Sequence, residues 1–399
     1  MRVLVTIVED YYPSGTGFAQ AFYNLHRSLI ENNSCDQIIV LTTKQDAQST
    51  DERIVVKKIN KIKGLRLLQN KLLRKVGKLY IKNKINPVLQ NLKDVVENND
   101  IQMILLESMF MAWAIPFIKE VYPSIPVVCR IHGTGPEYTA YLRNRIVTKY
   151  NDYLLQELFR NKNIAVTTEY YIRFFMELFP DYAKFMDKNF FIIPNTTTEM
   201  PLRNLPNSDS TVTLLQLGRM NQMGYHQKGF QDTIKALLYI EEIMPELARK
   251  LHYISIGTGE MEKEFINISN KLNIVQHTHY SKLPNEEVKK IEQKVDVILL
   301  PSRCEGMSMF ATEVLAAGKP IIYTKYNGLD CLCKDGFNAL GMDYYDYLKM
   351  AECIIKFASD NAFRKQCAAN SSLLFEKEYS YKAVAMKYEV AVRYLKGWE

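Results

Sequence analysis

The sequence VDVILLPSRCEGMSMFATEVLAAGKPIIYT (Val295–Thr324) contains the unit that decides the fold. Its first apolar run, Val295–Leu300, predicts a strand, and the polar segment Pro301–Ser308 predicts the loop that follows. A helix over Met309–Ala317 and a second strand over Lys319–Thr324 complete the segment. A strand, a helix and another strand in this order are typical of parallel strands in an α/β protein.

The loop and the start of the helix form an arrangement that favours an anion. Ser308 is suited to cap the helix, Gly318 to end it, and Pro320 lies just beyond that end. The first turn of such a helix presents free backbone N–H groups and the positive end of the helix dipole. A diphosphate fits this description.

The same alternation extends outward from this segment in both directions. The apolar runs are rich in Val and Ile and are continuous, which is typical of strands that are covered on both faces. Before it, strands are predicted at Arg2–Val8, Gln37–Thr43, Arg53–Ile59, Ile101–Leu106, Pro126–Ile131, Asn163–Thr167, Phe190–Ile193, Thr213–Leu217 and Leu251–Ile256. Helices are predicted at Gly17–Asn32, Tyr138–Phe159, Gln231–Arg249, Met261–Leu272, Asn285–Lys294 and Tyr381–Trp398.

A polar segment with three prolines, Pro194–Ser210, interrupts the series and predicts a linker. The sequence therefore predicts an α/β protein with two Rossmann-like doubly wound domains that face each other across a cleft. The expected domains are residues 1–195, residues 196–380, and a terminal helix over 381–399. Ligands of doubly wound sheets bind at the carboxyl ends of the strands.

Two carboxylates flank the start of the central helix. Glu305 lies on the loop and Glu313 on the second helical turn. One can face a reacting sugar while the other accepts hydrogen bonds from ribose hydroxyls. The alternative is a helix with two ordinary surface glutamates.

Two cations follow the strand Thr213–Leu217. Arg219 comes directly after Gly218, and Lys228 precedes Gly229 at the start of the next predicted helix. Arginine binds a phosphate with two hydrogen bonds, and lysine acts as a compact point charge. Both would stabilise negative charge on a leaving nucleoside diphosphate. The alternative is a pair of surface cations.

Three further segments end strands at the predicted cleft. Gly15 and Gly17 follow the first strand, and Gly257 follows the strand Leu251–Ile256. Glycine allows the backbone to approach a phosphate or a sugar closely. His132 ends another strand and is expected at the rim of the cleft, although a lone histidine is more often structural.

Taken together, these segments resemble family 4 of the retaining glycosyltransferases, which have the GT-B fold. Glu305 and Glu313 stand at the spacing of its E-x(7)-E motif, and Ala316–Ile322 is similar to the run that usually follows it. Arg219 and Lys228 resemble the cation pair of the family, with a longer gap between them. Ser308 stands where the family often has glycine.

The resemblance implies a role for each of these residues. Glu305 would contact the donor sugar, and Glu313 the ribose. Arg219 and Lys228 would hold the diphosphate, while His132 would lie near the donor sugar and the acceptor. The remaining donor-binding positions would be Gly15, Gly17, Gly257, Gly306, Met307 and Ser308. The first domain would take the acceptor, the second the nucleotide sugar, and the terminal helix would cross back to the first domain.

A metal ion is not expected. Glycosyltransferases that hold the diphosphate through a divalent metal commonly use an Asp-x-Asp motif, which this sequence lacks. Arg219 and Lys228 can supply the same charge. We therefore expect no metal and no cofactor, the nucleotide sugar being a substrate.

Composition and length are those of an ordinary globular protein. The chain has 399 residues, 24% of them charged, and no apolar stretch reaches the roughly 20 residues that a membrane-spanning helix needs. No signal peptide is recognised at the amino end. The seven scattered cysteines predict free thiols in a reducing compartment, so we expect a cytoplasmic protein.

The net charge of +7 is concentrated in one place. The segment Lys57–Lys84 contains eleven Lys and Arg residues and no acid, with leucines and a valine at helical spacing. Three interpretations stay open: docking on an anionic lipid surface at the cytoplasmic face of the inner membrane, a core-facing helix with a solvated basic back, and nucleic-acid binding. No recognisable module supports the last, so we expect no nucleic-acid partner.

The resemblance thus implies a retaining hexosyltransferase of the bacterial surface-glycan type. It would move a sugar from a UDP- or GDP-sugar to a glycan or a lipid-linked glycan, as in polysaccharide or lipopolysaccharide synthesis. Two alternatives stay open, a sugar-nucleotide epimerase of the same fold and a non-catalytic protein that binds nucleotides or membranes.

Overall fold

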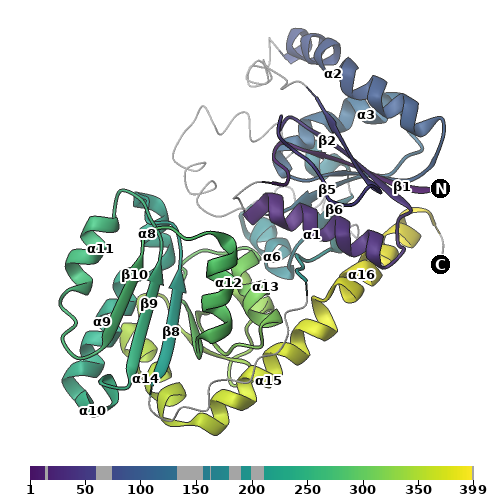
Figure 1. Cartoon of the computed structure of the whole chain (residues 1–399). Coiled ribbons are helices and arrows are strands. Elements are labelled where there is room, and N and C mark those ends of the chain that lie inside the picture. Colours follow the sequence, from purple (N-terminus) through teal and green to yellow (C-terminus); the bar gives the residue numbers. More distant parts are fainter. Residues whose placement is uncertain are drawn as a thin grey trace. The chain divides into compact units, whose positions relative to one another are not determined.

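The computed structural model describes residues 1–13, 17–59, 74–132, 156–161, 163–178, 190–198 and 211–397 (Figure 1). The chain divides into two compact units, which we call unit 1 (Met1–Thr197 with Tyr379–Glu399) and unit 2 (Thr198–Glu378). The sequence analysis placed the corresponding boundaries after residues 195 and 380. Each unit has its own sheet and its own hydrophobic core.

The described part of unit 1 is built on a parallel sheet of seven strands in the order β3-β2-β1-β4-β5-β6-β7. The strands are β1 (Arg2–Val8), β2 (Gln37–Thr42), β3 (Ile54–Lys58), β4 (Asp100–Leu106), β5 (Val127–Ile131), β6 (Ile164–Val166) and β7 (Phe190–Ile192). The helices are α1 (Gly17–Glu31), α2 (Arg74–Val96), the 3-10 helix η2 (Met109–Ala114), α3 (Ile115–Val121), α6 (Glu169–Leu178) and α16 (Tyr381–Leu395).

Both faces of the unit 1 sheet are covered, as continuous apolar strands require. Along β1, Val3, Val5 and Ile7 pack into one hydrophobic cluster with residues of α2 and α6. Leu4 and Val8 point to the other face and pack with residues of α1 and α16. Figure 1 shows α1 and α16 side by side on that face. The last helix of the chain is therefore part of unit 1.

Unit 2 has a parallel sheet of six strands in its described part, in the order β10-β9-β8-β11-β12-β13. These are β8 (Val212–Leu217), β9 (Leu251–Ile256), β10 (Gln276–Tyr280), β11 (Val297–Leu300), β12 (Ile321–Thr324) and β13 (Ala339–Met342). The helices are α8 (Gln222–Lys228), α9 (Phe230–Ile243), α10 (Pro245–Ala248), α11 (Glu262–Ser269), α12 (Asn285–Lys294), α13 (Met309–Ala316), the 3-10 helix η3 (Gly328–Cys331), α14 (Tyr347–Ser359) and α15 (Asn361–Glu378).

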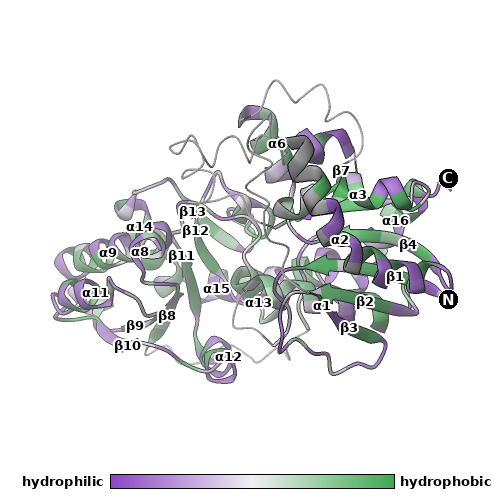
Figure 2. Ribbon diagram, turned by 90° about the horizontal axis from the view of Figure 1, so that it is seen from above, coloured by the Kyte–Doolittle hydropathy of each residue, from purple (hydrophilic) through white to green (hydrophobic). Residues whose placement is uncertain are grey.

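The predicted strands are found within two residues of their expected ends, but β10 and β13 were not predicted. The sequence of β10, QHTHY, has no apolar run, because this strand lies at the edge of the sheet and is partly exposed. The helix predicted over Gln231–Arg249 is split at Pro245, which begins α10. Figure 2 shows the strands β11 and β12 in hydrophobic colours and α11 in hydrophilic ones.

Three predicted features lie largely outside the described residues. They are most of the helix expected over Tyr138–Phe159, most of the linker, and the middle of the basic segment Lys57–Lys84. Within the described ranges, no helix has the length and apolar character that crossing a bilayer requires. All seven cysteines are free thiols, as predicted.

Candidate active site

The chain changes direction within the unit 2 sheet between β8 and β11. From β8 it proceeds to β9 and β10 on one side, and it returns to β11, on the other side of β8, through α12. In doubly wound sheets the crevice at such a point, beyond the carboxyl ends of the strands, is the usual ligand site. The segments that follow β8 and β11 here are Gly218–Arg219 and Pro301–Ser308.

Hydrogen bonds to backbone carbonyl groups hold the segment Pro301–Ser308 from two sides. The Gln227 side chain donates to the Cys304 carbonyl at 2.6 Å, and the Gly328 N–H donates to the Glu305 carbonyl at 2.9 Å. A Cβ atom at position 328 would lie 1.9 Å from the Gly306 carbonyl oxygen, so only glycine fits there. The backbone position of Glu305 is therefore set by α8 and by the turn after β12.

The central contact of the site is an ion pair between Lys228 Nζ and Glu305 Oε1. Both side chains are largely buried, with exposed fractions of 18% for Lys228 and 11% for Glu305. Removing either partner would leave a poorly solvated charge without its counter-ion. The structure thus brings together two residues that the sequence analysis had placed in separate roles.

Most of the residues that separate Arg219 from Lys228 in the sequence belong to the helix α8. Asn221 caps α8 by accepting a hydrogen bond from the Gly224 N–H at 2.7 Å, and Tyr225 is buried. Lys228 is the last residue of α8, and Gly229 ends the helix in the left-handed conformation. The additional residues therefore form a helix, and Lys228 at its end reaches Glu305.

Arg219 and the first turn of α13 come after the same two neighbouring strands, β8 and β11. Arg219 is exposed, and the described part of the chain provides no hydrogen-bond or ion-pair partner for its guanidinium group. Ser308 caps α13, as predicted, by accepting from the Ala311 N–H at 3.3 Å. Gly306 is half-buried and Met307 is buried beneath this turn. Beyond the carboxyl ends of β8 and β11 the described chain thus has an unpaired cation and a helix N-terminus, and each of them favours an anion.

Gly257 and Glu313 have different surroundings. A Cβ atom at position 257 would lie 2.1 Å from the Gly218 carbonyl oxygen, so the loops after β8 and β9 are in backbone contact. Glu313 lies on the second turn of α13 and is half-buried. Burial raises the pKa of its carboxyl group, although the charge of Lys289 lowers it.

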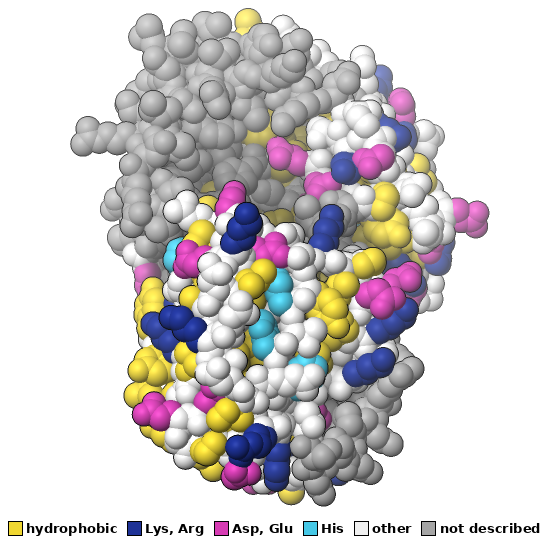
Figure 3. All heavy atoms as spheres, turned by 60° about the vertical axis from the view of Figure 1, so that its left-hand side comes forward, with side chains coloured by type: hydrophobic (Ala, Val, Ile, Leu, Met, Phe, Trp, Pro, Cys, Tyr) yellow, Lys and Arg dark blue, Asp and Glu magenta, His cyan; other side chains and the backbone are white. Residues whose placement is uncertain are grey.

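A polar network supports the loop after β9. Ser255 is hydrogen-bonded to His277 and His279, at 2.9 Å each, and His279 approaches Glu262 at 3.3 Å. Glu262 in turn accepts from Thr258 at 2.7 Å, within the loop that contains Gly257. Figure 3 shows histidine side chains gathered on this face of the molecule. The hydrogen bonds of Ser281 and Thr258 lower the pKa of Glu262 to about 2.

Unit 1 places His132 in a buried charged cluster. His132 Nε2 lies 2.6 Å from Glu107 Oε2, and Arg130 Nη1 lies 3.4 Å from the same carboxylate. Arg130 also donates to the carbonyls of Ile193 and Pro194, at 3.0 Å each. Burial would raise the pKa of Glu107, but Arg130 and His132 more than offset it, and the pKa falls to about 2.

The protonation states in this cluster follow from burial. Burial, and then the charge of Arg130, lowers the pKa of His132 to about 4, so its ring is neutral at pH 7. Because Glu107 is ionised, Nε2 of His132 carries the proton and donates it.

The glycines predicted after β1 are only partly accounted for. Gly15 lies outside the described residues, and Gly17 is the exposed first residue of α1. The neighbouring Phe18 ring meets His132 edge-on, with ring centroids 6.3 Å apart.

The sequence analysis missed Glu107 and Arg130 as site residues. Glu107 directly follows the apolar strand β4, which is the signal that would have found it.

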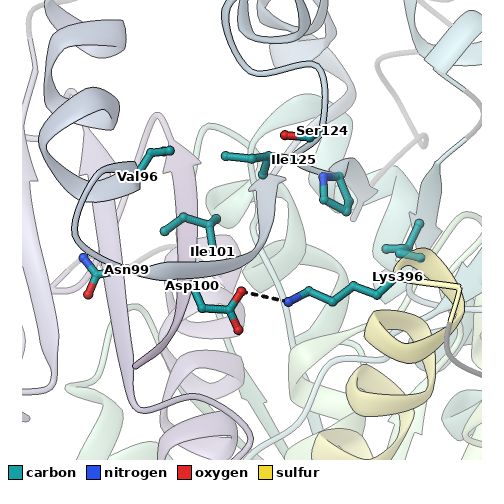
Figure 4. Close-up of a pocket in the computed structure, with 9 residues that line it drawn as sticks. Val96, Asn99, Asp100, Ile101, Ser124, Ile125 and Lys396 are labelled. Atoms are coloured by element: carbon teal, nitrogen blue, oxygen red, sulfur yellow. Dashed lines mark hydrogen bonds and ion pairs between the residues drawn. The ribbon is translucent and has the colours of Figure 1, made fainter.

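A separate pocket of about 490 Å³ lies at the opposite edge of the unit 1 sheet, at the amino ends of β4 and β5 (Figure 4). Asp100 and Lys396 form an ion pair of 3.0 Å across it. No predicted site residue lines this pocket. Within the described residues, no group of three or more His, Cys, Asp or Glu side chains is arranged to hold a metal ion.

Comparison with known proteins finds likenesses in the sequence of unit 2. A family model described as Glycosyl transferases group 1 matches residues 204–373. The curated relatives include an uncharacterised glycosyltransferase of Methanocaldococcus jannaschii, 29% identical over 33% of this chain and 37% of that protein. A D-inositol 3-phosphate glycosyltransferase of Corynebacterium diphtheriae is 24% identical over 48% of this chain and 44% of its own. The chain thus spans less than half the length of these two relatives.

Solved structures resemble the whole chain in fold. Sucrose-phosphate synthase from Thermosynechococcus elongatus matches with a TM-score of 0.71 at 12% identity, over 100% of both chains. A trehalose-6-phosphate structure from E. coli, bound with UDP-2-fluoro glucose, matches with a TM-score of 0.68 at 14% identity, over 98% of this chain and 99% of that one. The two Rossmann-like units are therefore those of the GT-B fold, and the likeness to the group 1 glycosyltransferase model extends over residues 204–373.

Proposed function

We propose that this protein is a retaining glycosyltransferase that uses a UDP- or GDP-sugar as donor. One observation carries the proposal: the Lys228–Glu305 ion pair lies at the point where the unit 2 sheet changes direction, within the segment that the group 1 family model matches. Arg219 and the first turn of α13 supply positive potential at the same place. The donor diphosphate would bind there.

The residues of unit 2 would act on the leaving group and the sugar. Arg219 and Lys228 would stabilise the charge that develops on the diphosphate as the bond to the sugar breaks. Glu305 would accept hydrogen bonds from hydroxyls of the donor sugar, and Glu313 from the ribose. Gly306, Met307 and Ser308 would bring backbone N–H groups to the phosphates, and Gly257 would line the nucleotide.

Retention of configuration would follow from attack on the donor's own face. The acceptor oxygen would form a bond to the anomeric carbon while the bond from that carbon to the diphosphate breaks. The departing phosphate oxygen would take the proton of the acceptor hydroxyl. In unit 1, neutral His132 would serve as a hydrogen-bonding group near the sugar, held in one tautomer by Glu107. No step in this scheme needs a metal ion.

The proposal predicts that nucleoside diphosphates bind more tightly than monophosphates. UDP or GDP, at about a hundred times its Kd, should stabilise unit 2 by about 2.7 kcal/mol and raise its melting temperature by several degrees. UMP and GMP at the same concentration should give a clearly smaller shift, because they lack the phosphate that meets Arg219. Differential scanning calorimetry measures this. Equal shifts in melting temperature for nucleoside mono- and diphosphates would contradict the proposed diphosphate site.

For the acceptor, we propose a glycan or a lipid-linked glycan at an anionic membrane surface. The support is the basic segment Lys57–Lys84, of which the described part includes Leu79, an exposed apolar side chain on α2. Each basic residue near an anionic leaflet contributes about 1 kcal/mol, which salt screens. The donor would then be used at the cytoplasmic face of that membrane.

Vesicle sedimentation tests the membrane contact. Wild type should bind vesicles that contain phosphatidylglycerol, bind neutral ones poorly, and be released by high salt. The triple variant Lys71→Glu, Arg74→Glu, Lys75→Glu should lose this binding and keep its affinity for nucleotides. A control variant, Lys263→Glu, Lys271→Glu, Lys282→Glu, makes the same charge change at exposed positions of unit 2. If both triple variants bind as wild type does, the basic segment has no membrane role.

A further inference from the structure

Three exposed tyrosines lie in the loops that follow β12 and β13. Tyr326 follows β12, and Tyr344 and Tyr345 follow β13; their exposed fractions are 66%, 37% and 67%. Because β12 and β13 are parallel neighbours, their carboxyl ends meet at one edge of the sheet (Figure 2). A single exposed aromatic side chain is ordinary, but three in two neighbouring loops form a patch. We call these three residues the tyrosine patch.

Two contacts join the loops that carry the tyrosine patch. The Tyr344 hydroxyl donates to the Tyr326 carbonyl at 3.1 Å. Lys325 Nζ lies 3.5 Å from the Asp343 carboxylate and 5.6 Å from the centre of the Tyr326 ring. The two loops are thereby held together, so the three tyrosines belong to one surface.

The backbone is strained at two of the three tyrosines. Tyr326 has a φ of 65° and Tyr345 a φ of 63°, both in the left-handed region. A bulky side chain is disfavoured there because its Cβ atom crowds the following carbonyl, whereas glycine is free of this cost. The third non-glycine residue with positive φ in the described chain is Asn33, and asparagine tolerates this conformation. Strain of this kind is typical of functional positions, so the two rings need a role besides folding.

The tyrosine patch is continuous with the segment Pro301–Ser308. The guanidinium group of Arg303, in this segment, lies 4.3 Å from the centre of the Tyr345 ring. Asn327, the residue after Tyr326, donates from its side chain to a backbone carbonyl of the same segment at 3.1 Å. Both strained tyrosines are therefore positioned by the loop that carries the proposed sugar-binding carboxylate.

The order of the strands indicates which part of a bound donor lies nearest to the patch. Along the carboxyl edge of the sheet, β9, β8, β11, β12 and β13 follow one another. In the proposed function, Gly257 after β9 lines the nucleotide, Arg219 after β8 meets the diphosphate, and Glu305 after β11 meets the sugar. Neighbouring strands are about 4.8 Å apart, so the patch begins one strand beyond the proposed sugar position, on the side away from the nucleotide.

Tyrosine suits a carbohydrate at this place. A sugar ring has an apolar face of C–H groups and a rim of hydroxyls, and tyrosine combines an apolar ring face with one hydroxyl. We infer that the tyrosine patch is a carbohydrate subsite, which holds a sugar of the acceptor glycan other than the one that reacts. The inference rests on the proposed function, and it makes the acceptor a chain of several sugars. Tyr326 and Tyr345 would stack on the C–H faces of that chain.

Binding of oligosaccharides by the full chain tests the inference. An array of immobilised hexose, hexosamine and heptose chains of increasing length identifies a binder, and isothermal titration measures its Kd. Wild type should bind a chain of several sugars more tightly than the corresponding single sugar. The double variant Tyr326→Gly, Tyr345→Gly lacks two rings and should raise this Kd about tenfold or more. Its Kd for UDP and GDP should equal that of wild type.

The glycine variant also separates a binding role from a packing role. Glycine relieves the left-handed strain at both positions, so the melting temperature of this variant should be no lower than that of wild type. The control Asn33→Gly makes the same kind of backbone change in unit 1 and should leave oligosaccharide affinity unchanged. The variant Tyr326→Phe, Tyr345→Phe keeps both rings and should retain most of that affinity.

Three results would each overturn the inference. Wild type binds no oligosaccharide on the array, the glycine variant binds as wild type does, or the melting temperature of the glycine variant falls clearly, which would make the rings packing elements. Failure of the proposed function looks different, because wild type would then bind neither UDP nor GDP, whatever its affinity for oligosaccharides.

Discussion

Lys228→Met should lower kcat/KM for donor turnover by a factor of about a hundred to a thousand, or roughly 3–4 kcal/mol. Two effects add in this variant. In the proposed function the diphosphate loses one of its two side-chain cations. The Glu305 carboxylate, with 11% of its side chain exposed, also loses its counter-ion. Steady-state release of UDP or GDP at varied donor concentration measures the change.

Matched variants separate these effects. Arg219→Ala removes an exposed cation that has no partner in the described chain, so it should cost about a hundredfold without the penalty of an unpaired acid. Lys235→Met, an exposed lysine on α9, should leave turnover unchanged. If Lys228→Met behaves as Lys235→Met does, the ion pair with Glu305 is only structural and the phosphate role is wrong.

The second large effect concerns substitutions of the two carboxylates, which should impair different properties of the enzyme. Glu305→Gln should lower kcat about a hundredfold and leave nucleotide affinity near that of wild type, because in the proposed function Glu305 contacts the donor sugar. Glu313→Gln should mainly raise the Kd of UDP or GDP, because in the proposed function Glu313 contacts the ribose. Calorimetry of nucleotide binding and initial rates of turnover separate the two. Equal nucleotide affinity in wild type and both variants would contradict the proposed contact between Glu313 and the ribose.

Most of the fold was predictable because buried parallel strands leave a strong signal in the sequence. Runs such as those of β1 and β11 are continuous in apolar residues, since both faces of these strands are covered. The edge strand β10 gave no such signal, because its histidines and threonine form hydrogen bonds at a partly exposed edge. A proline splits α9 from α10, and attention to Pro245 would have predicted that break.

The site was predictable where chemistry and local structure coincide. Ser308 caps α13 as expected, since a hydroxyl before a helical run is a local signal. The Lys228–Glu305 pair was not predicted, because it joins residues 77 positions apart through the packing of α8 against the loop after β11. Glu107 and Arg130 were missed for the same reason. The sequence places each of them at the end of a predicted strand, but only the fold shows that Glu107 contacts both Arg130 and His132.

The central claim is that this protein transfers sugar from a nucleotide donor at the Lys228–Glu305 site with retention of configuration. Proton NMR of wild type and Glu305→Gln, incubated with a panel of α-linked UDP- and GDP-sugars in EDTA, tests it most directly. The account predicts that wild type consumes one donor, releases the nucleoside diphosphate and forms a product whose first anomeric signal is α, while Glu305→Gln reaches about 1% of that rate. A product that first appears in the β configuration, or equal rates for the two proteins, would contradict it.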